Sequence, residues 1–358
     1  MQTESIELSI LSLFAPISFF IFLICQKISS KESLSFFLDH DFSKPQAFHG
    51  EPIARIGGLA SLISLIIFFI LYYLIFEKIL YDYLFVSLTL FLIGLLDDIK
   101  ISINPKTRLI LMIIFLTFFI SYFSIDILRV DLNFLNNWLE NRFFQLSFIL
   151  LCFLFVINGS NLIDGFNGLI SIHLLIINAL LLFINLIYGN MELSVFITAQ
   201  IIILFSFLLF NFPKAKMFLG DGGAYLFGAL IALNVIKTNN LIPEITSFFF
   251  CIILFYLFFE VFFSFFRKIF EKKNPLKPDD NHLHMLLFKK LNKKIEAKKA
   301  NFLTSLILNS YYAVLILPSI FFTENGFICR YLFLTLLFIY ILTYYYFRKD
   351  SFINNEKI

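Results

Sequence analysis

Charged residues are scarce in this chain of 358 residues: only 15% are Asp, Glu, Lys or Arg, whereas 59% are hydrophobic. A soluble domain carries about 25% charged residues, so this inventory excludes a protein with a fully water-facing surface. The net charge of +3 is also too small to argue for nucleic-acid binding. We therefore expect no nucleic acid among the partners of this chain.

Cysteine is rare as well, and the four that occur are Cys25, Cys152, Cys251 and Cys329. They lie far apart, each in or beside an apolar run, and no CxxC or Cys/His spacing typical of metal ligands is present. They are expected to be small apolar packing residues. The first apolar run follows two glutamates rather than basic residues, so it is predicted to be a retained helix and not a signal peptide.

Long apolar runs, by contrast, are plentiful. A helix that crosses a bilayer needs about 20 mostly apolar residues, and its backbone polar groups must pair within the segment. The sequence therefore predicts an all-α integral membrane protein with about eleven transmembrane helices, forming a single polytopic domain over residues 1–358. The expected spans are Ile6–Cys25, Gly57–Phe76, Leu80–Leu96, Leu109–Ile125, Phe143–Ile157, Gly168–Ile187, Leu193–Phe210, Gly223–Ile236, Ile245–Phe266, Phe302–Phe322 and Phe327–Phe347.

The basic residues are distributed unequally between the two predicted faces. With eleven spans, 23 of the 28 Lys and Arg residues lie on the face shared by the loops after odd-numbered spans and by the C-terminus. The positive-inside rule makes this face cytoplasmic and places the N-terminus outside. The longest connection on this face is a basic cytoplasmic loop, residues 267–301, whose Lys289–Lys299 stretch is expected to contact anionic headgroups.

Two neighbouring acids, Asp97 and Asp98, close the third predicted span. Adjacent carboxylates are costly unless a cation or a proton shares them. Hard divalent cations such as Mg²⁺ bind one or two carboxylates together with substrate phosphates. The pair is therefore a candidate metal or catalytic site, and an ordinary solvated helix end is the alternative.

The next cytoplasmic loop carries a polar residue at every third position between two apolar spans: Asn158, Asn161, Asp164 and Asn167. A helix cap would account for Asp164 but not for the row of asparagines. The loop contains glycines, which allow close approach of a ligand, and the following span begins near Gly168. A helix N-terminus there would suit a phosphate.

Two further cytoplasmic loops contain candidate residues. Asp221 lies between two glycines, where it is either a helix cap or a carboxylate held in a glycine frame. His282 and His284 follow two aspartates in the basic loop, and their spacing does not suit zinc. Beside lysines, these two imidazoles could contact a diphosphate.

Two ionisable residues fall inside predicted spans. Glu260 lies in the ninth, on about the same helix face as Arg267. An intramembrane acid is a functional candidate by default, although a buried pair with a basic side chain explains it equally well. His173, in the sixth span, is expected to be a satisfied packing residue.

The order of these motifs resembles a known family. A Gly-Leu-Leu-Asp-Asp span end, N-x-x-N-x-x-D-G-x-N-G-L, F-L-G-D-x-G and P-D-x-N-H-L-H occur in succession, and K-P-Q-x-F-H and R-I-G-G precede them. The chain resembles the polyprenyl-phosphate N-acetylhexosamine-1-phosphate transferases of glycosyltransferase family 4. It looks most similar to bacterial undecaprenyl-phosphate N-acetylglucosamine-1-phosphate transferases of O-antigen or teichoic acid synthesis.

The resemblance implies an enzyme of the bacterial inner membrane with its active site on the cytoplasmic face. A UDP-N-acetyl-amino sugar and undecaprenyl phosphate would give the lipid diphosphosugar and UMP, with Mg²⁺ or Mn²⁺ as cofactor; membrane lipids and a second copy of the chain are further expected partners. The implied site residues are Asp97, Asp98, Asp164 and Arg108 for catalysis, Asn167 and Asp221 for the metal, and Asn161, Asn211, His282, His284 and Arg55 for the substrates.

Three positions depart from the pattern of the family. Asn167 stands where many bacterial relatives have Asp, and its amide removes a charge while keeping one ligating oxygen. Ile101 replaces an acid that some relatives have. Met285 follows His284, so the three-histidine run of the muramyl-pentapeptide branch is missing, which argues against a peptidoglycan substrate.

Other functions are weighed against this one. A transporter or lipid flippase without transferase activity would carry acids at several depths, whereas Glu260 is the main embedded one. A CDP-alcohol phosphatidyltransferase would need a D-G-x-x-A-R motif followed by spaced aspartates, and that spacing does not occur.

Overall fold

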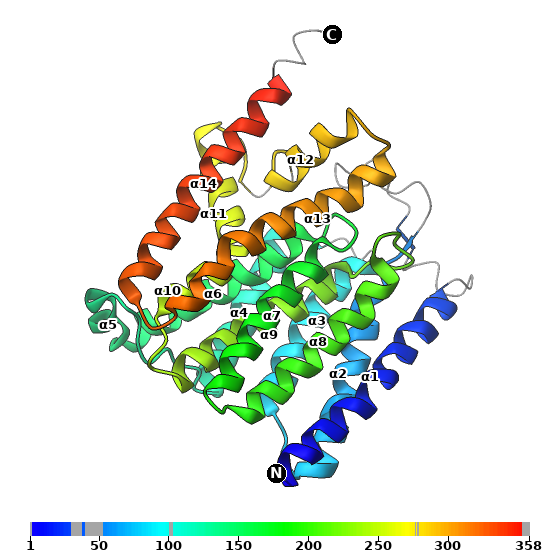
Figure 1. Ribbon diagram of the computed structural model, residues 1–358, viewed down its shortest axis with the longest axis vertical. Helices are drawn as coiled ribbons and strands as arrows, with labels where there is room; N and C mark the ends of the chain where they lie inside the picture. Colours follow the sequence, from blue (N-terminus) through cyan, green and yellow to red (C-terminus); the bar gives the residue numbers. More distant parts are fainter. Residues whose placement is uncertain are drawn as a thin grey trace.

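The computed structural model describes residues 2–29, 38–39, 53–99, 103–275, 277 and 279–352. Within these ranges the chain is a bundle of helices with one two-stranded antiparallel ribbon, in which Leu38 pairs with Ala54 and Asp39 with Ile53 (Figure 1). Ile101 and the K-P-Q-x-F-H motif, residues 44–49, lie outside the described residues.

The elements follow one another along the chain as follows: α1 Gln2–Ser29, β1 Leu38–Asp39, β2 Ile53–Ala54, α2 Gly57–Phe76, α3 Tyr81–Asp98, α4 Pro105–Tyr122, α5 Asn133–Leu139, α6 Arg142–Ile163, α7 Leu169–Ile187, α8 Met191–Asn211, α9 Gly220–Leu241, α10 Ser247–Ile253, α11 Phe255–Phe270, α12 Leu283–Asn292, α13 Ala297–Ile316, the 3₁₀ helix η2 Leu317–Phe322 and α14 Gly326–Phe352.

An all-α membrane protein is confirmed. In the described part of the chain, eight helical segments are long and apolar enough to cross a membrane. They correspond to α1, α2, α4, α6, α7, α8, α13 with η2, and α14. The predicted ninth span is helical but broken, because α10 and α11 meet at an angle of 74°.

The predicted third and eighth spans are the helices α3 and α9, which are less apolar than the others and pack against each other inside the bundle. Tyr83 of α3 donates to the side-chain oxygen of Asn234 of α9 (2.9 Å), and Asn234 donates to Gln200 of α8 (3.0 Å). A helix that faces other helices instead of lipid can carry such polar residues when they are hydrogen-bonded. All eleven predicted segments are therefore helical, and the number that crosses the membrane stays a prediction.

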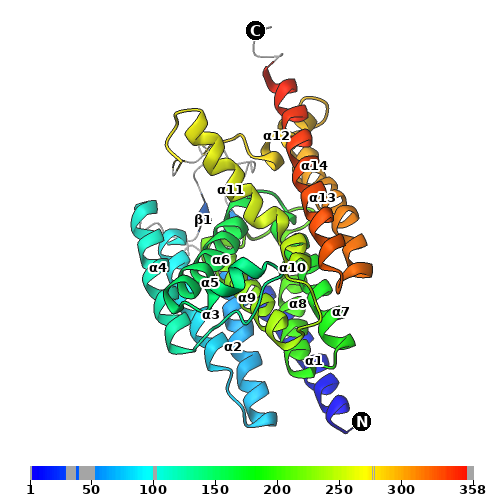
Figure 2. The same ribbon diagram turned by 90° about the vertical axis from the view of Figure 1, so that its left-hand side faces the viewer.

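Helix ends from distant parts of the chain meet at one end of the bundle. The N–H groups of Gly57 and Gly58, at the start of α2, donate to the carbonyls of Phe218 (2.9 Å) and Leu219 (2.8 Å), just before α9. Figures 1 and 2 show that α1 begins at one end of the molecule and α14 ends at the other. The start of α1 and the end of α14 thus lie far apart.

Candidate active site

The acids that the sequence analysis selected from three separate loops converge at one end of the bundle. Arg108, in the first turn of α4, joins two of them through a single nitrogen. Its Nη1 lies 2.8 Å from Oδ2 of Asp97, at the end of α3, and 2.7 Å from Oδ2 of Asp221, at the start of α9. Burial and then the nearby charge of Asp221 raise the pKa of Asp97, whereas Arg108 acts in the opposite direction. Residues that lie 113 positions apart in sequence (Arg108 and Asp221) therefore form one cluster.

Asp98 has a different environment from its neighbour. It is buried, and its two carboxylate oxygens accept the backbone N–H groups of Asp221 and Gly222, each at 2.9 Å. Arg55, just ahead of α2, places its Nη1 3.8 Å from Oδ1 of Asp98. A carboxylate at a helix N-terminus satisfies unpaired N–H groups and favours the helix dipole. Asp98 thus fixes the start of α9, and with it the position of Asp221.

Asp164 follows the last residue of α6 and lies near Gly220, at the start of α9. Burial, together with the nearby charge of Asp221, raises the pKa of Asp164 to about 7, although Arg55 and the backbone N–H of Gly220 act in the opposite direction. Two aspartates, one from α3 and one from the loop after α6, therefore lie at the start of α9, and Asp98 accepts two of its N–H groups.

The donor set of this cluster fits a hard divalent cation. Four carboxylates, from Asp97, Asp98, Asp164 and Asp221, lie near the two guanidinium groups of Arg55 and Arg108, which leaves an excess of negative charge and of oxygen ligands. The described residues contain no preformed group of three or more acid, His or Cys ligands around one point. A cation bound here would need waters and substrate phosphates among its ligands.

The asparagines of the site mainly shape its loops. Asn211, at the end of α8, accepts the N–H of Gly168 (2.6 Å) and donates to the carbonyl of Met217 (2.9 Å), so both ends of its amide are engaged and the side chain is buried. Asn158 donates to the carbonyl of Leu154 in its own helix (2.7 Å). The two bonds of Asn211 connect the start of α7 to the loop that precedes α9.

Asn167 lies in the same loop region. Its side chain donates to the carbonyl of Pro213 (3.0 Å), and its N–H donates to Asn301 of α13 (2.9 Å). Asn161 is half-buried near the end of α6. The metal role of Asn167 and the nucleotide-contact roles of Asn161 and Asn211 stay predictions.

The two loop histidines lie beside the loop after α6. His282 Nδ1 is 3.0 Å from Glu260 of α11, and His284 Nδ1 is 3.1 Å from the hydroxyl of Tyr256. The His284 ring packs against Phe166, two residues after Asp164, with 5.8 Å between the ring centroids. Burial lowers the pKa of His284 to about 3, so this imidazole is neutral near pH 7.

Several partners in this region were missed by the sequence analysis, namely Phe166, Tyr256, Asn301 and Tyr340. Phe166 is the unspecified position within the N-x-x-N-x-x-D-G-x-N-G-L motif, and the other three belong to helices that carry no local signal of a site; only the packing of α11, α13 and α14 around the loops reveals their contacts. His173 is buried, as expected, and its Nδ1 lies 3.1 Å from Oδ1 of Asn309. Its Nε2 has no hydrogen-bond partner among the described residues, so the prediction of a satisfied residue holds for one nitrogen only.

Comparison with known proteins gives the same result as the motifs. The profile of glycosyl transferase family 4 matches residues 80–239, which include Asp97, Asp98, Arg108, Asp164 and Asp221. An undecaprenyl-phosphate alpha-N-acetylglucosaminyl 1-phosphate transferase of Thermotoga maritima is 29% identical over 280 residues, which cover 78% of this chain and 81% of that protein.

Other similar proteins act in a different branch. A phospho-N-acetylmuramoyl-pentapeptide-transferase of Streptococcus pneumoniae is 31% identical over 207 residues, which span 54% of this chain and 62% of that protein. The enzyme of the same name from Clostridium perfringens is 29% identical over 150 residues, 39% of this chain and 47% of that protein. The profile match over residues 80–239 and these relatives thus agree with the motifs: the chain is similar to proteins of glycosyl transferase family 4.

Proposed function

We propose that this protein transfers an N-acetyl-amino-sugar 1-phosphate from a UDP-sugar to undecaprenyl phosphate, releasing UMP and forming a lipid diphosphosugar. The product would initiate a cell-surface glycan such as O-antigen or teichoic acid. The observation that carries the proposal is that one nitrogen of Arg108 forms ion pairs with both Asp97 and Asp221. The similarity to the undecaprenyl-phosphate alpha-N-acetylglucosaminyl 1-phosphate transferase of Thermotoga maritima supports the same reaction.

Mg²⁺ is the proposed cofactor, with Mn²⁺ as a substitute. Asp97 and Asp221 would hold it, because their carboxylates come from two helices and both lie within 2.8 Å of the same nitrogen of Arg108; Asn167 is a further predicted ligand. When bound, the cation would offset the negative charge of the UDP-sugar diphosphate and of the departing UMP.

The residues of the chain would act mainly by positioning and by charge. The attacking lipid phosphate has a second pKa of about 6, so it is largely ionised near neutral pH and needs no strong base. One of its oxygens attacks the sugar-linked phosphorus, and the bond from that phosphorus to the UMP oxygen breaks. Arg108 and Arg55 would neutralise phosphate oxygens, while Asp98 keeps the start of α9 in place.

The inner membrane of a bacterium, with the site facing the cytoplasm, is the proposed location. The excess of basic residues on the face that holds this site supports that orientation. Binding of a second copy of the chain stays a prediction.

Release of UMP tests the proposal directly. Membranes containing the protein are incubated with Mg²⁺, undecaprenyl phosphate and one UDP-sugar at a time, including UDP-N-acetylglucosamine and its 6-deoxy relatives. We expect release that requires both the lipid phosphate and the cation, and the panel identifies the sugar. Asp221→Ala should abolish nearly all release while the protein still inserts. Absence of release from the wild type with every donor, or normal release by Asp221→Ala, would contradict the proposal.

A further inference from the structure

Glu260 is a buried acid that the proposed chemistry does not use. It is 1% exposed and lies in α11, below the bend that separates this helix from α10. One carboxylate oxygen is 3.0 Å from His282 Nδ1 and 3.3 Å from the N–H of Leu283, and the other accepts the hydroxyl of Tyr340 at 2.6 Å. Three donors offset the high cost of burying this charge. Its partner is thus His282, and not Arg267, which pairs with Asp279.

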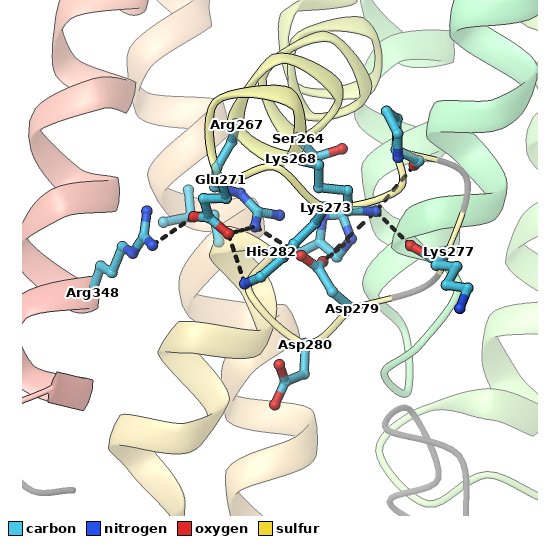
Figure 3. Close-up of polar contacts among 12 residues, drawn as sticks. Ser264, Arg267, Lys268, Glu271, Lys273, Lys277, Asp279, Asp280, His282 and Arg348 are labelled. Atoms are coloured by element: carbon cyan, nitrogen blue, oxygen red, sulfur yellow. Dashed lines mark hydrogen bonds and ion pairs between the residues drawn. The ribbon is translucent and has the colours of Figure 1, made fainter.

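His282 is held from both sides. Its Nε2 lies 3.2 Å from Asp279 Oδ1, and Asp279 is fixed in turn by Arg267 Nη1 at 2.7 Å. Figure 3 shows Asp279 between His282, Arg267 and Lys268. Carboxylate oxygens of this chain thus lie within 3.2 Å of both ring nitrogens of His282, which is 3% exposed.

His284 differs from His282 because one of its ring nitrogens has no partner. The two rings stack in parallel, 3° apart in orientation and 5.6 Å between centroids. Tyr256 engages only Nδ1 of His284, and Nε2 is buried without a hydrogen-bond partner among the described residues. A buried polar atom without a partner requires an explanation, of which a missing ligand is one. The contact of this ring with Phe166 places it beside the Asp164 loop.

We infer that Glu260 is a positioning residue for the sugar-nucleotide donor: it fixes His282, and His282 supports the stacked ring of His284, whose Nε2 meets the donor diphosphate. This inference rests on the proposed function. It assigns different tasks to the two histidines, with His282 as a support and His284 as the contact.

Steady-state kinetics of UMP release, with the UDP-sugar varied, tests the inference. Glu260→Asp shortens the side chain by one methylene, so its carboxylate can no longer reach His282 and Tyr340 together. We expect KM for the donor to rise about tenfold, the effect of one weakened charged hydrogen bond, with kcat changed less than about twofold. Glu260→Gln, which keeps the volume, is the second variant if Glu260→Asp does not fold. Unchanged kinetics, or a fall in kcat at constant KM, would overturn the inference.

A double-mutant cycle separates positioning from general destabilisation. If Glu260 acts through His284, adding Glu260→Asp to His284→Ala should raise KM by less than about twofold, because the contact is already gone. Fully additive losses would instead mean that Glu260 only stabilises the fold. Tyr311→Phe is the matched control, since it removes a hydroxyl bond between α13 and α14 (2.9 Å to Thr343) outside the Glu260 cluster. Its KM should equal that of the wild type.

A spectroscopic measurement keeps the inference testable even if the transferase activity is absent. With ¹⁵N-labelled histidine, the ring nitrogens of His282 and His284 are observed directly and assigned with His282→Gln and His284→Gln. Glu260→Asp should shift the ring-nitrogen signals of both histidines. Wild-type protein that releases no UMP with any donor, although Glu260→Asp shifts both signals, would refute the proposed transfer reaction but not the link from Glu260 to His284. Signals of His284 that do not respond to Glu260→Asp would refute the positioning role.

Discussion

Gly220 lies directly against the carboxylate of Asp98. Its backbone has φ of 77°, and a Cβ atom built on it would be 2.6 Å from both carboxylate oxygens. Only glycine meets both conditions, because other residues are strained at this φ and would displace the acid. This close approach lets Asp98 reach the N–H groups of the next two residues and so locate Asp221.

Asp98→Asn should therefore harm both stability and turnover. A carboxamide has a single acceptor oxygen, so one of the two N–H groups at the start of α9 would face an NH₂ group. A buried donor left unpaired costs about 1–3 kcal/mol, which a fall in the melting temperature would report. UMP release should fall with it, because Asp221 is displaced.

The same substitution at the other end of α3 provides the control. Asp82 forms an ion pair with Lys237, and both side chains are partly exposed. A surface pair contributes about 0–1 kcal/mol, so Asp82→Asn should release UMP at nearly the wild-type rate. Equal behaviour of the two variants would show that Asp98 does not hold α9.

Arg108→Lys should retain more activity than Arg108→Ala. The same nitrogen of Arg108 reaches both Asp97 and Asp221, and one ammonium group can replace one nitrogen. Without any cation, the two carboxylates repel each other. We expect kcat within about tenfold of the wild type for Lys and a loss of about 100-fold or more for Ala, measured by UMP release. Equal losses in both variants would mean that the planar guanidinium itself is required.

Stability should depend on pH through Asp164. Its pKa is raised from 3.8 to about 7 in the folded protein, chiefly by burial. A carboxyl with a raised pKa binds its proton more tightly when folded, so its contribution to stability is complete below pH 3.8 and is lost as the pH rises through about 7.

Melting temperatures in EDTA between pH 4 and pH 8 would test this dependence. Asp164→Asn cannot ionise, so the variant should lose less stability than the wild type as the pH rises, and it should melt at a higher temperature than the wild type at pH 8. Added Mg²⁺ should narrow the difference at pH 8 by stabilising the ionised acid. Parallel curves for the two proteins would show that Asp164 does not titrate in this range.

The orientation of the bundle can be measured with an impermeant thiol reagent. Lys214 and Asn137 are both exposed, and the predicted topology places Lys214 in the cytoplasm and Asn137 outside. Lys214→Cys should be labelled only after the membrane is permeabilised, and Asn137→Cys in intact cells. The parent protein, with its four native cysteines, gives the background. Labelling of both sites from the same side would refute the topology.

The sequence by itself was sufficient to predict the class of fold and to select acids that converge in the candidate site. Apolar runs of span length appear wherever a helix must satisfy its own backbone in lipid, so all eleven predicted segments are helices. Polar residues such as Asp97 and Asp221 stand out against that apolar background, and the motifs around them resemble those of a known family. These signals are local, and a single sequence displays them.

The tertiary structure alone decided which partners these residues have. Nothing in the order of residues shows that α3 and α9 pack inside the bundle, that α10 and α11 meet at a 74° bend, or that Glu260 pairs with His282 and Tyr340 instead of Arg267. Such pairings depend on which helix faces meet. Helix packing selects those faces through the shapes and volumes of many side chains at once, whereas a local pattern records only one helix at a time.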